Sequence, residues 1–171
     1  FMKVCIIGDG LTSLALAKTL VNQDIYVDLV CNYKTKNYDK TRTIGLSKYN
    51  VEFFNKNIIN INKILWDIKK IKIYTESSKD DEIIGFSDFN KKLFSIIQNK
   101  KLFDQLNNNL KKNKFFNLKK NKTYKNLCND DYNLIINCDL NHEITTKFFS
   151  KKFEKNYHSI AYTMIIDHEK L

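Results

Sequence analysis

Two glycines, Gly8 and Gly10, lie one residue apart directly after an apolar run, in a chain with only four glycines among its 171 residues. A glycine tolerates a positive φ angle and lets a ligand approach the backbone, because it has no Cβ atom. The residues that follow predict a helix, and a helix N-terminus favours an anion through its unpaired N–H groups and its dipole. This spacing therefore indicates a site for a phosphate group.

The phosphate-binding pattern of dinucleotide sites is G-x-G-x-x-G, and residues 8–13 read Gly-Asp-Gly-Leu-Thr-Ser. Ser13 stands where the third glycine allows close packing of helix on strand, and serine is small enough for a mild departure. A strand before the pattern and a helix after it are the context that such a site needs. We therefore expect Gly8, Gly10, Leu11, Thr12 and Ser13 to hold a dinucleotide, the alternative being two turn glycines without a ligand.

The same logic expects an acid near residue 31, at the end of the second strand, to bind a ribose 2′-hydroxyl group. The sequence has Cys31 and Asn32 there, with no carboxylate. Asn32 offers a weak acceptor, whereas Asp28 lies too early and in the wrong phase of the strand. We expect this neutral ribose contact to lower the affinity for a dinucleotide.

The first 30 residues predict a βαβ unit with a right-handed crossover. It has an apolar strand over 3–7, a helix with one apolar face over 11–21 and a second strand over 25–30. Beyond it the pattern is less regular, and Asp88 is placed as the N-cap of one of the later helices. The later elements are expected as helices over 50–61, 88–98, 102–110 and 143–149, and as strands over 68–74, 83–86, 115–118, 123–127, 131–138 and 157–166.

Composition limits the possible functions. The net charge is +10, but lysine and asparagine are spread along the whole chain and proline is absent, which is typical of a composition bias. We therefore expect no specific nucleic-acid partner, and we leave peripheral contact with an anionic membrane open. No segment is apolar enough to span a bilayer, and none reads as a signal peptide. The four cysteines have no zinc-site spacing and indicate a reducing cytoplasm.

Other catalytic motifs are missing from the sequence. The three histidines show no metal-ligand spacing with cysteines or acids, so we expect no metal site. The G-x-S-x-G pattern of α/β-hydrolases and the P-loop of NTPases are both absent.

Four segments, in order, resemble the FAD-dependent aromatic-ring monooxygenases, and most of all the ubiquinone-biosynthesis hydroxylases. VCIIGDGLTSLALAKTL at 4–20 is similar to the family's strand–GxGxxG–helix, and TRTIGLSKYNVEFF at 41–54 looks like its R-x-x-x-L-S segment. DEIIGFSDFNKKLFSIIQN at 81–99 is similar to the stretch where a substrate-domain strand returns into a helix beside the flavin. DYNLIINCDLNHEITTKFF at 131–149 resembles the A-D-L-V-I-G-A-D-G-x-x-S-x-x-R motif.

The resemblance implies an α/β fold. A Rossmann-like βαβ domain with a parallel sheet (1–62 and 87–150) would bind FAD, interleaved with part of a β-sheet substrate domain (63–86 and 151–171). It implies reduction of the flavin by NAD(P)H and hydroxylation of an aromatic or quinone-precursor ring with O2. Gly8, Gly10 and Ser13 would hold the pyrophosphate, Arg42 would contact FAD, and Asp139 would be the acid of the D-G motif.

Two departures leave alternatives open. The D-G motif here reads Asn-Cys-Asp-Leu at 137–140, so both flanking glycines are lost. The family's later G-D motif lies beyond residue 171, which suggests either a fragment or a reduced relative. A non-catalytic relative that kept the fold as a binding or interaction module is therefore the second interpretation. A basic peripheral protein that docks on a membrane or a nucleic acid is the third, and the sequence does not predict an oligomeric state.

Overall fold

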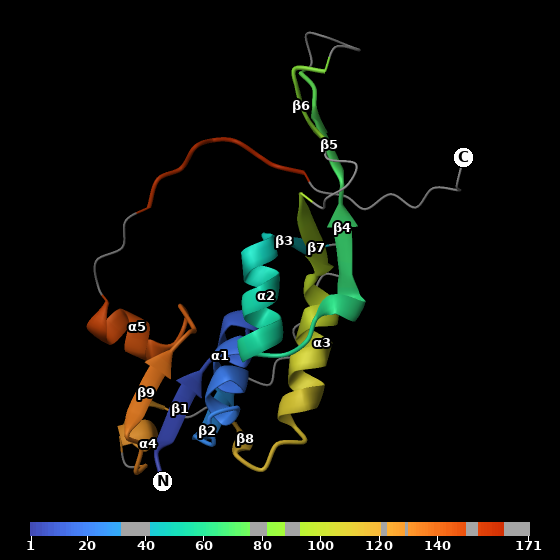
Figure 1. Cartoon of the computed structure of the whole chain (residues 1–171). Coiled ribbons are helices and arrows are strands. Elements are labelled where there is room, and N and C mark those ends of the chain that lie inside the picture. The colour runs from blue at the N-terminus through green and yellow to red at the C-terminus, as the bar shows by residue number, and fades with distance from the viewer. Residues whose placement is uncertain are drawn as a thin grey trace.

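The structure is a computed structural model that describes residues 1–31, 42–75, 82–87, 93–120, 123–128, 130–149 and 154–162. At one end of the molecule lies a four-stranded, fully parallel sheet in the order β8-β2-β1-β9 (Figure 1). The strands are β1 (Lys3–Ile7), β2 (Tyr26–Cys31), β8 (Phe116–Lys120) and β9 (Leu134–Asn137), and helix α1 (Leu11–Val21) connects β1 to β2. The predicted α/β fold with a parallel sheet is confirmed.

A second sheet has three antiparallel strands. The strands β3 (Thr43–Leu46), β7 (Phe94–Gln98) and β4 (Leu65–Ile68) form a sheet in the order β3-β7-β4. Helix α2 (Lys48–Asn57) follows β3, the short helix η1 (Asn62–Ile64) precedes β4, and helix α3 (Asn99–Leu110) follows β7. Ser47 caps α2 by accepting a hydrogen bond from the Asn50 N–H at 3.2 Å, as an N-cap serine should.

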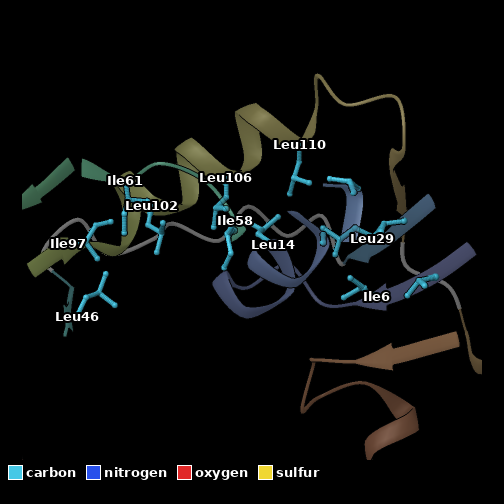
Figure 2. Packing of buried hydrophobic residues seen from close by; sticks show 14 of the residues in the cluster. Ile6, Leu14, Leu29, Leu46, Ile58, Ile61, Ile97, Leu102, Leu106 and Leu110 are labelled. Carbon is cyan, nitrogen blue, oxygen red and sulfur yellow. The ribbon is translucent and has the colours of Figure 1, made fainter. Parts of the chain in front are cut away.

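The larger hydrophobic core lies between α1, α2, α3 and one face of the parallel sheet. Leu102, Leu106 and Leu110 repeat every fourth residue on α3, so they share one buried face of that helix. Figure 2 shows them on the side of α3 turned toward Ile58 and Leu14. Because the central strands are covered on both faces, β1 is apolar from Val4 to Ile7, and β2 is apolar apart from Asp28.

The other face of the parallel sheet is covered by two short helices, α4 (Tyr124–Cys128) and α5 (Glu143–Phe148). Leu127 of α4 and Ile144 of α5 pack there with Cys5, Ile7 and Val30. Among the described residues, no helix has the length and apolarity needed to cross a bilayer.

A two-stranded ribbon, β5 (Lys70–Ile73) with β6 (Ile84–Ser87), projects from the rest of the molecule (Figure 1). The register pairs Ile71 with Phe86 and Ile73 with Ile84, so one face of the ribbon is apolar. Ile73, Ile84 and Phe86 are about half exposed, at 44%, 47% and 50%. Lys72, on the opposite face, pairs with Glu82 at 2.7 Å. The ribbon contributes no residue to either core cluster.

Three of the expected elements are wrong. Residues 94–98 form strand β7 rather than a helix, because they pair with both β3 and β4, and Asp88 lies outside the described residues. Residues 124–128 form helix α4 rather than a strand, with the Thr123 hydroxyl accepting from the Asn126 N–H at 3.4 Å. No strand forms over 157–162, where the chain has no pairing partner among the described residues. Strands β3 and β4 and helix η1 were not expected.

One buried carboxylate links β2 to β1, to β8 and to the turn before β9. Asp28 in β2 is 5% exposed. Its Oδ2 accepts from the Tyr132 hydroxyl at 2.7 Å and pairs with the ammonium groups of Lys119 at 2.7 Å and Lys3 at 3.5 Å. Its Oδ1 accepts from the Asn117 side-chain amide at 3.2 Å. The partners come from β1, β8 and the turn before β9, so this carboxylate fixes the strands beside one another.

Replacing Asp28 by asparagine should lower the free energy of unfolding by about 2–3 kcal/mol, since it leaves two ammonium groups without their shared anion. Urea denaturation followed by circular dichroism measures the change. Asp24→Asn is the matched control: Asp24 is exposed with φ at 57°, a conformation that asparagine also accepts. Equal effects of the two substitutions would contradict the role of the Asp28 cluster.

The Asp28 cluster should also make stability depend on pH. Burial raises the pKa of the Asp28 carboxyl, but the hydrogen bonds from Lys119, Tyr132 and Asn117 and the Lys119 charge outweigh it, so the net pKa is lowered. The hydrogen bond to Asp28 raises the pKa of Lys119.

The contribution of Asp28 should therefore be complete above about pH 4 and lost as the pH falls through its lowered folded-state pKa. That of Lys119 should be complete below about pH 10.4 and lost as the pH rises through its raised folded-state pKa. Urea titrations across both limits should show these losses in the unaltered chain and not in Asp28→Asn.

Candidate dinucleotide site at the end of strand β1

Gly8 occupies a backbone position that only glycine accepts without strain. Its φ angle is +119°, and its N–H donates to the Val30 carbonyl at 2.8 Å, which extends the pairing of β1 with β2. A Cβ atom here would lie 3.0 Å from Ser13 Oγ, 3.3 Å from the Cys138 carbonyl carbon and 3.4 Å from the Asp139 nitrogen. Gly8 is therefore the point where β1, α1 and the chain after β9 touch.

Gly10 lies at the N-terminus of α1 and faces open space. It is the N-cap residue, with φ −79° and ψ 173°, and no side chain caps the helix there. The first helical hydrogen bond runs from the Leu14 N–H to the Gly10 carbonyl at 3.1 Å, so the N–H groups of Leu11, Thr12 and Ser13 have no acceptor within the helix. A Cβ at Gly10 would meet nothing within 4 Å. The space next to Gly10 is thus open, and of the residues that follow it Thr12 is exposed whereas Ser13 is buried.

Ser13, at the third position of the pattern, packs between α1 and the Gly8 turn. The residue is 1% exposed, and its hydroxyl group lies against Gly8. That hydroxyl has no hydrogen-bond partner, although it is buried. The helix and the strand approach one another closely with a serine here. The unsatisfied hydroxyl costs a small amount of free energy, which a glycine at this position would avoid.

The end of β9 approaches the glycine turn from the other side. The Cys138 N–H donates to the Ile7 carbonyl at 2.8 Å, which brings Asp139 next to Gly8. The Asp139 carboxylate accepts from the Asn141 N–H at 3.0 Å, so it stabilises its own turn. Leu140, where the related motif has glycine, is 83% exposed.

The structure connects the other predicted site residues less directly to the glycine turn. Cys31 ends β2 and is 7% exposed, with its thiol directed at the Lys119 carbonyl at 4.0 Å. Asn32 lies outside the described residues. Arg42 is exposed just before β3, and its carbonyl accepts from the Asn99 N–H at 2.9 Å. No hydrogen bond within the described part of the chain joins Arg42 to residues 8–13.

Sequence reasoning missed the role of Asp28. A single acid inside an apolar strand is itself a signal, because a buried carboxylate needs partners that neutralise it. The sequence gives no indication of which residues those partners are.

A separate cavity of about 510 Å³ opens between α4 and α5. Its lining is Thr123, Lys125, Glu143, Thr146 and Lys147. None of these belongs to the glycine turn. Among the residues that the structure describes, no three His, Cys, Asp or Glu side chains are grouped as metal ligands would be.

Comparison with known proteins gives a likeness of structure only. No protein-family model matches the sequence, and no curated protein matches it. The p-nitrophenol 4-monooxygenase PnpA from Pseudomonas putida superimposes with a TM-score of 0.58 and 11% identity, over 71% of this chain and 33% of that chain.

Two further solved structures are also similar to this chain. PqsL from Pseudomonas aeruginosa, assigned as an FAD-dependent monooxygenase, gives a TM-score of 0.54 and 13% identity, over 70% of this chain and 32% of that chain. Klebsiella pneumoniae HpxO, complexed with FAD and uric acid, gives a TM-score of 0.52 and 15% identity, over 68% of this chain and 30% of that chain. The chain shares its fold with FAD-dependent monooxygenases. It spans about a third of the length of these proteins.

Replacing Gly8 by alanine should lower the free energy of unfolding by about 1–3 kcal/mol, because the side chain would be strained at φ +119° and would press on Ser13 and Cys138. Gly10→Ala should cost less, at most about 1 kcal/mol, since its backbone angles are ordinary and the space is open, so that only the poorer N-cap preference of alanine counts. Urea denaturation of both variants measures the difference. Equal loss in the two variants would show that the Gly8 turn is not built as described.

Proposed function

We propose that the chain is the FAD-binding portion of a flavin-dependent monooxygenase-like protein. The observation that supports this most directly is the open space at Gly10, beside the N-terminus of an 11-residue helix whose first N–H groups have no acceptor within the helix. A diphosphate bridging two nucleoside halves has the size and charge that such a helix end favours. The arrangement lies at the carboxyl ends of parallel strands, where such sheets bind ligands.

In this proposal the chain binds and orients the cofactor. Gly8 and Gly10 keep side chains away from the diphosphate, the first turn of α1 donates hydrogen bonds to it, and Ser13 holds the helix against β1. Arg42 would contact FAD with its guanidinium group, and Asp139 would stand beside the cofactor at the end of β9. Bound FAD supplies the redox and oxygen chemistry, while the protein determines its position and its access to solvent.

The finer parts of the proposal concern the reaction. The substrate would be an aromatic or quinone-precursor ring, hydroxylated with O2 and reducing equivalents from NAD(P)H, as in ubiquinone biosynthesis. HpxO holds FAD together with uric acid, which is a small planar ring compound of the same general class. Residues 63–86 and 151–171 would belong to the substrate domain, and 1–62 and 87–150 to the FAD-binding domain.

The proposal places the protein in a reducing cytoplasm, with peripheral contact to a membrane as an additional option. Cys5, Cys31 and Cys138 form no disulfide with one another. This agrees with thiols kept reduced.

A non-catalytic relative is the second candidate, and three observations favour it. Cys31 replaces the ribose-binding acid, the Asp139 carboxylate is engaged in its own turn, and Leu140 is a bulky residue where the related motif has glycine. A protein of this kind would keep the fold and bind FAD weakly or not at all.

Titration of the purified chain with FAD, followed by quenching of flavin fluorescence, should show saturable binding. Gly10→Val should abolish it, because the branched side chain would occupy the space for the diphosphate while the backbone angles suit valine. Thr19→Val, in the second half of the same helix, is the matched control and should bind as the unaltered chain does.

Two results would contradict the FAD-binding proposal. An absence of quenching at about 100 μM FAD, which is well above an ordinary cofactor affinity, would favour the non-catalytic relative. Equal binding by Gly10→Val and the unaltered chain would place FAD elsewhere on this basic protein.

A further inference from the structure

The end of β2 decides how a site of this fold treats the ribose of its nucleotide. A carboxylate at that position accepts hydrogen bonds from the ribose hydroxyl groups. It also rejects a ribose that carries a 2′-phosphate, because two negative charges would meet. The residue at the end of β2 therefore sets both affinity and selectivity for the ribose.

Cys31 holds this position without offering a carboxylate. It is the last residue of β2 and lies opposite Lys120 in the parallel register with β8. The thiol is buried, and it is directed at the carbonyl of Lys119 in the neighbouring strand. Its polar atom is thus turned along the sheet and engaged with β8.

Asp28, which is the only acid of β2, is committed elsewhere. It lies three residues earlier and therefore on the opposite face of the strand. Its two oxygens hold Lys119, Tyr132, Lys3 and Asn117 within 3.5 Å. A ribose could recruit this carboxylate only by breaking the cluster that joins the strands.

Within the described residues, the ends of β2 and β8 therefore carry no carboxylate that could receive a ribose hydroxyl group. The adjoining end of β8 is Lys119 followed by Lys120, which are both basic residues. A ribose phosphate at this corner would meet no opposing carboxylate from either strand.

We propose that the ends of β2 and β8 contribute no selectivity for the ribose, so that this nucleotide site accepts adenine nucleotides with a free or a 2′-phosphorylated ribose about equally. Cys31 is the residue that determines this lack of selectivity. The inference rests on the proposed function, because it concerns the ribose end of the same dinucleotide site.

The experiment compares ADP with its 2′-phosphorylated form by calorimetric titration of the full chain at one fixed ionic strength. The unaltered chain should bind the two with dissociation constants within about threefold. Cys31→Asp should bind ADP more tightly and the 2′-phosphorylated form more weakly, so that their ratio changes by at least about tenfold. Circular dichroism verifies that each variant is folded.

Three controls separate the cause from other effects. Cys31→Ser removes the thiol without adding charge and should keep the ratio near one. Gln23→Glu adds an acid in the exposed turn at the other end of β2 and should also keep it. Gly10→Val should bind neither nucleotide, so that any remaining heat reports attraction to the basic surface.

Each outcome decides a separate point. If the unaltered chain prefers ADP by more than about tenfold, the inference is wrong and the diphosphate site stands. A folded Cys31→Asp variant with an unchanged ratio would also overturn it. If the unaltered chain binds neither nucleotide, or if Gly10→Val binds both as well as the unaltered chain does, the proposed function fails and the inference fails with it.

Discussion

The geometry of the candidate site depends on the missing side chain at Gly8. Three elements meet there, since the Ser13 hydroxyl of α1 and the backbone at Cys138 and Asp139 all lie within 3.4 Å of the place where a Cβ would stand. This contact sets the N-terminus of α1 against the ends of β1 and β9. Two residues later, at the N-terminus of α1, Gly10 faces open space. The turn is therefore closely packed at Gly8 and open at Gly10.

The sheet under this turn is held together electrostatically as well as by its apolar core. Asp28 contacts side chains from β1 and β8, which are the two strands that pair with β2, and from the turn before β9. An isolated buried carboxylate would be costly, but two ammonium groups, a phenol and an amide satisfy it. The acid of β2 thus supports the sheet instead of a ligand.

An element could be predicted from the sequence where its local residue pattern indicates the same structure that its tertiary contacts require. The run at 3–7, the glycines and the helix at 11–21 each show their structure locally, so β1, the turn and α1 were predictable. Strand β7 was not, because the apolar spacing of its residues also suits a helix and only its pairing with β3 and β4 excludes that alternative. The partners of Asp28 were out of reach for a similar reason: Asn117 and Tyr132 lie 89 and 104 residues away along the chain.

The projecting β5–β6 ribbon implies that the chain does not have one uniform stability. The ribbon consists of a single pair of strands with an ion pair between Lys72 and Glu82. A two-stranded hairpin that stands alone has only marginal stability in water. Since neither core cluster includes any part of it, opening the ribbon leaves both cores intact. We therefore expect the ribbon to open at a lower free energy than the parallel sheet.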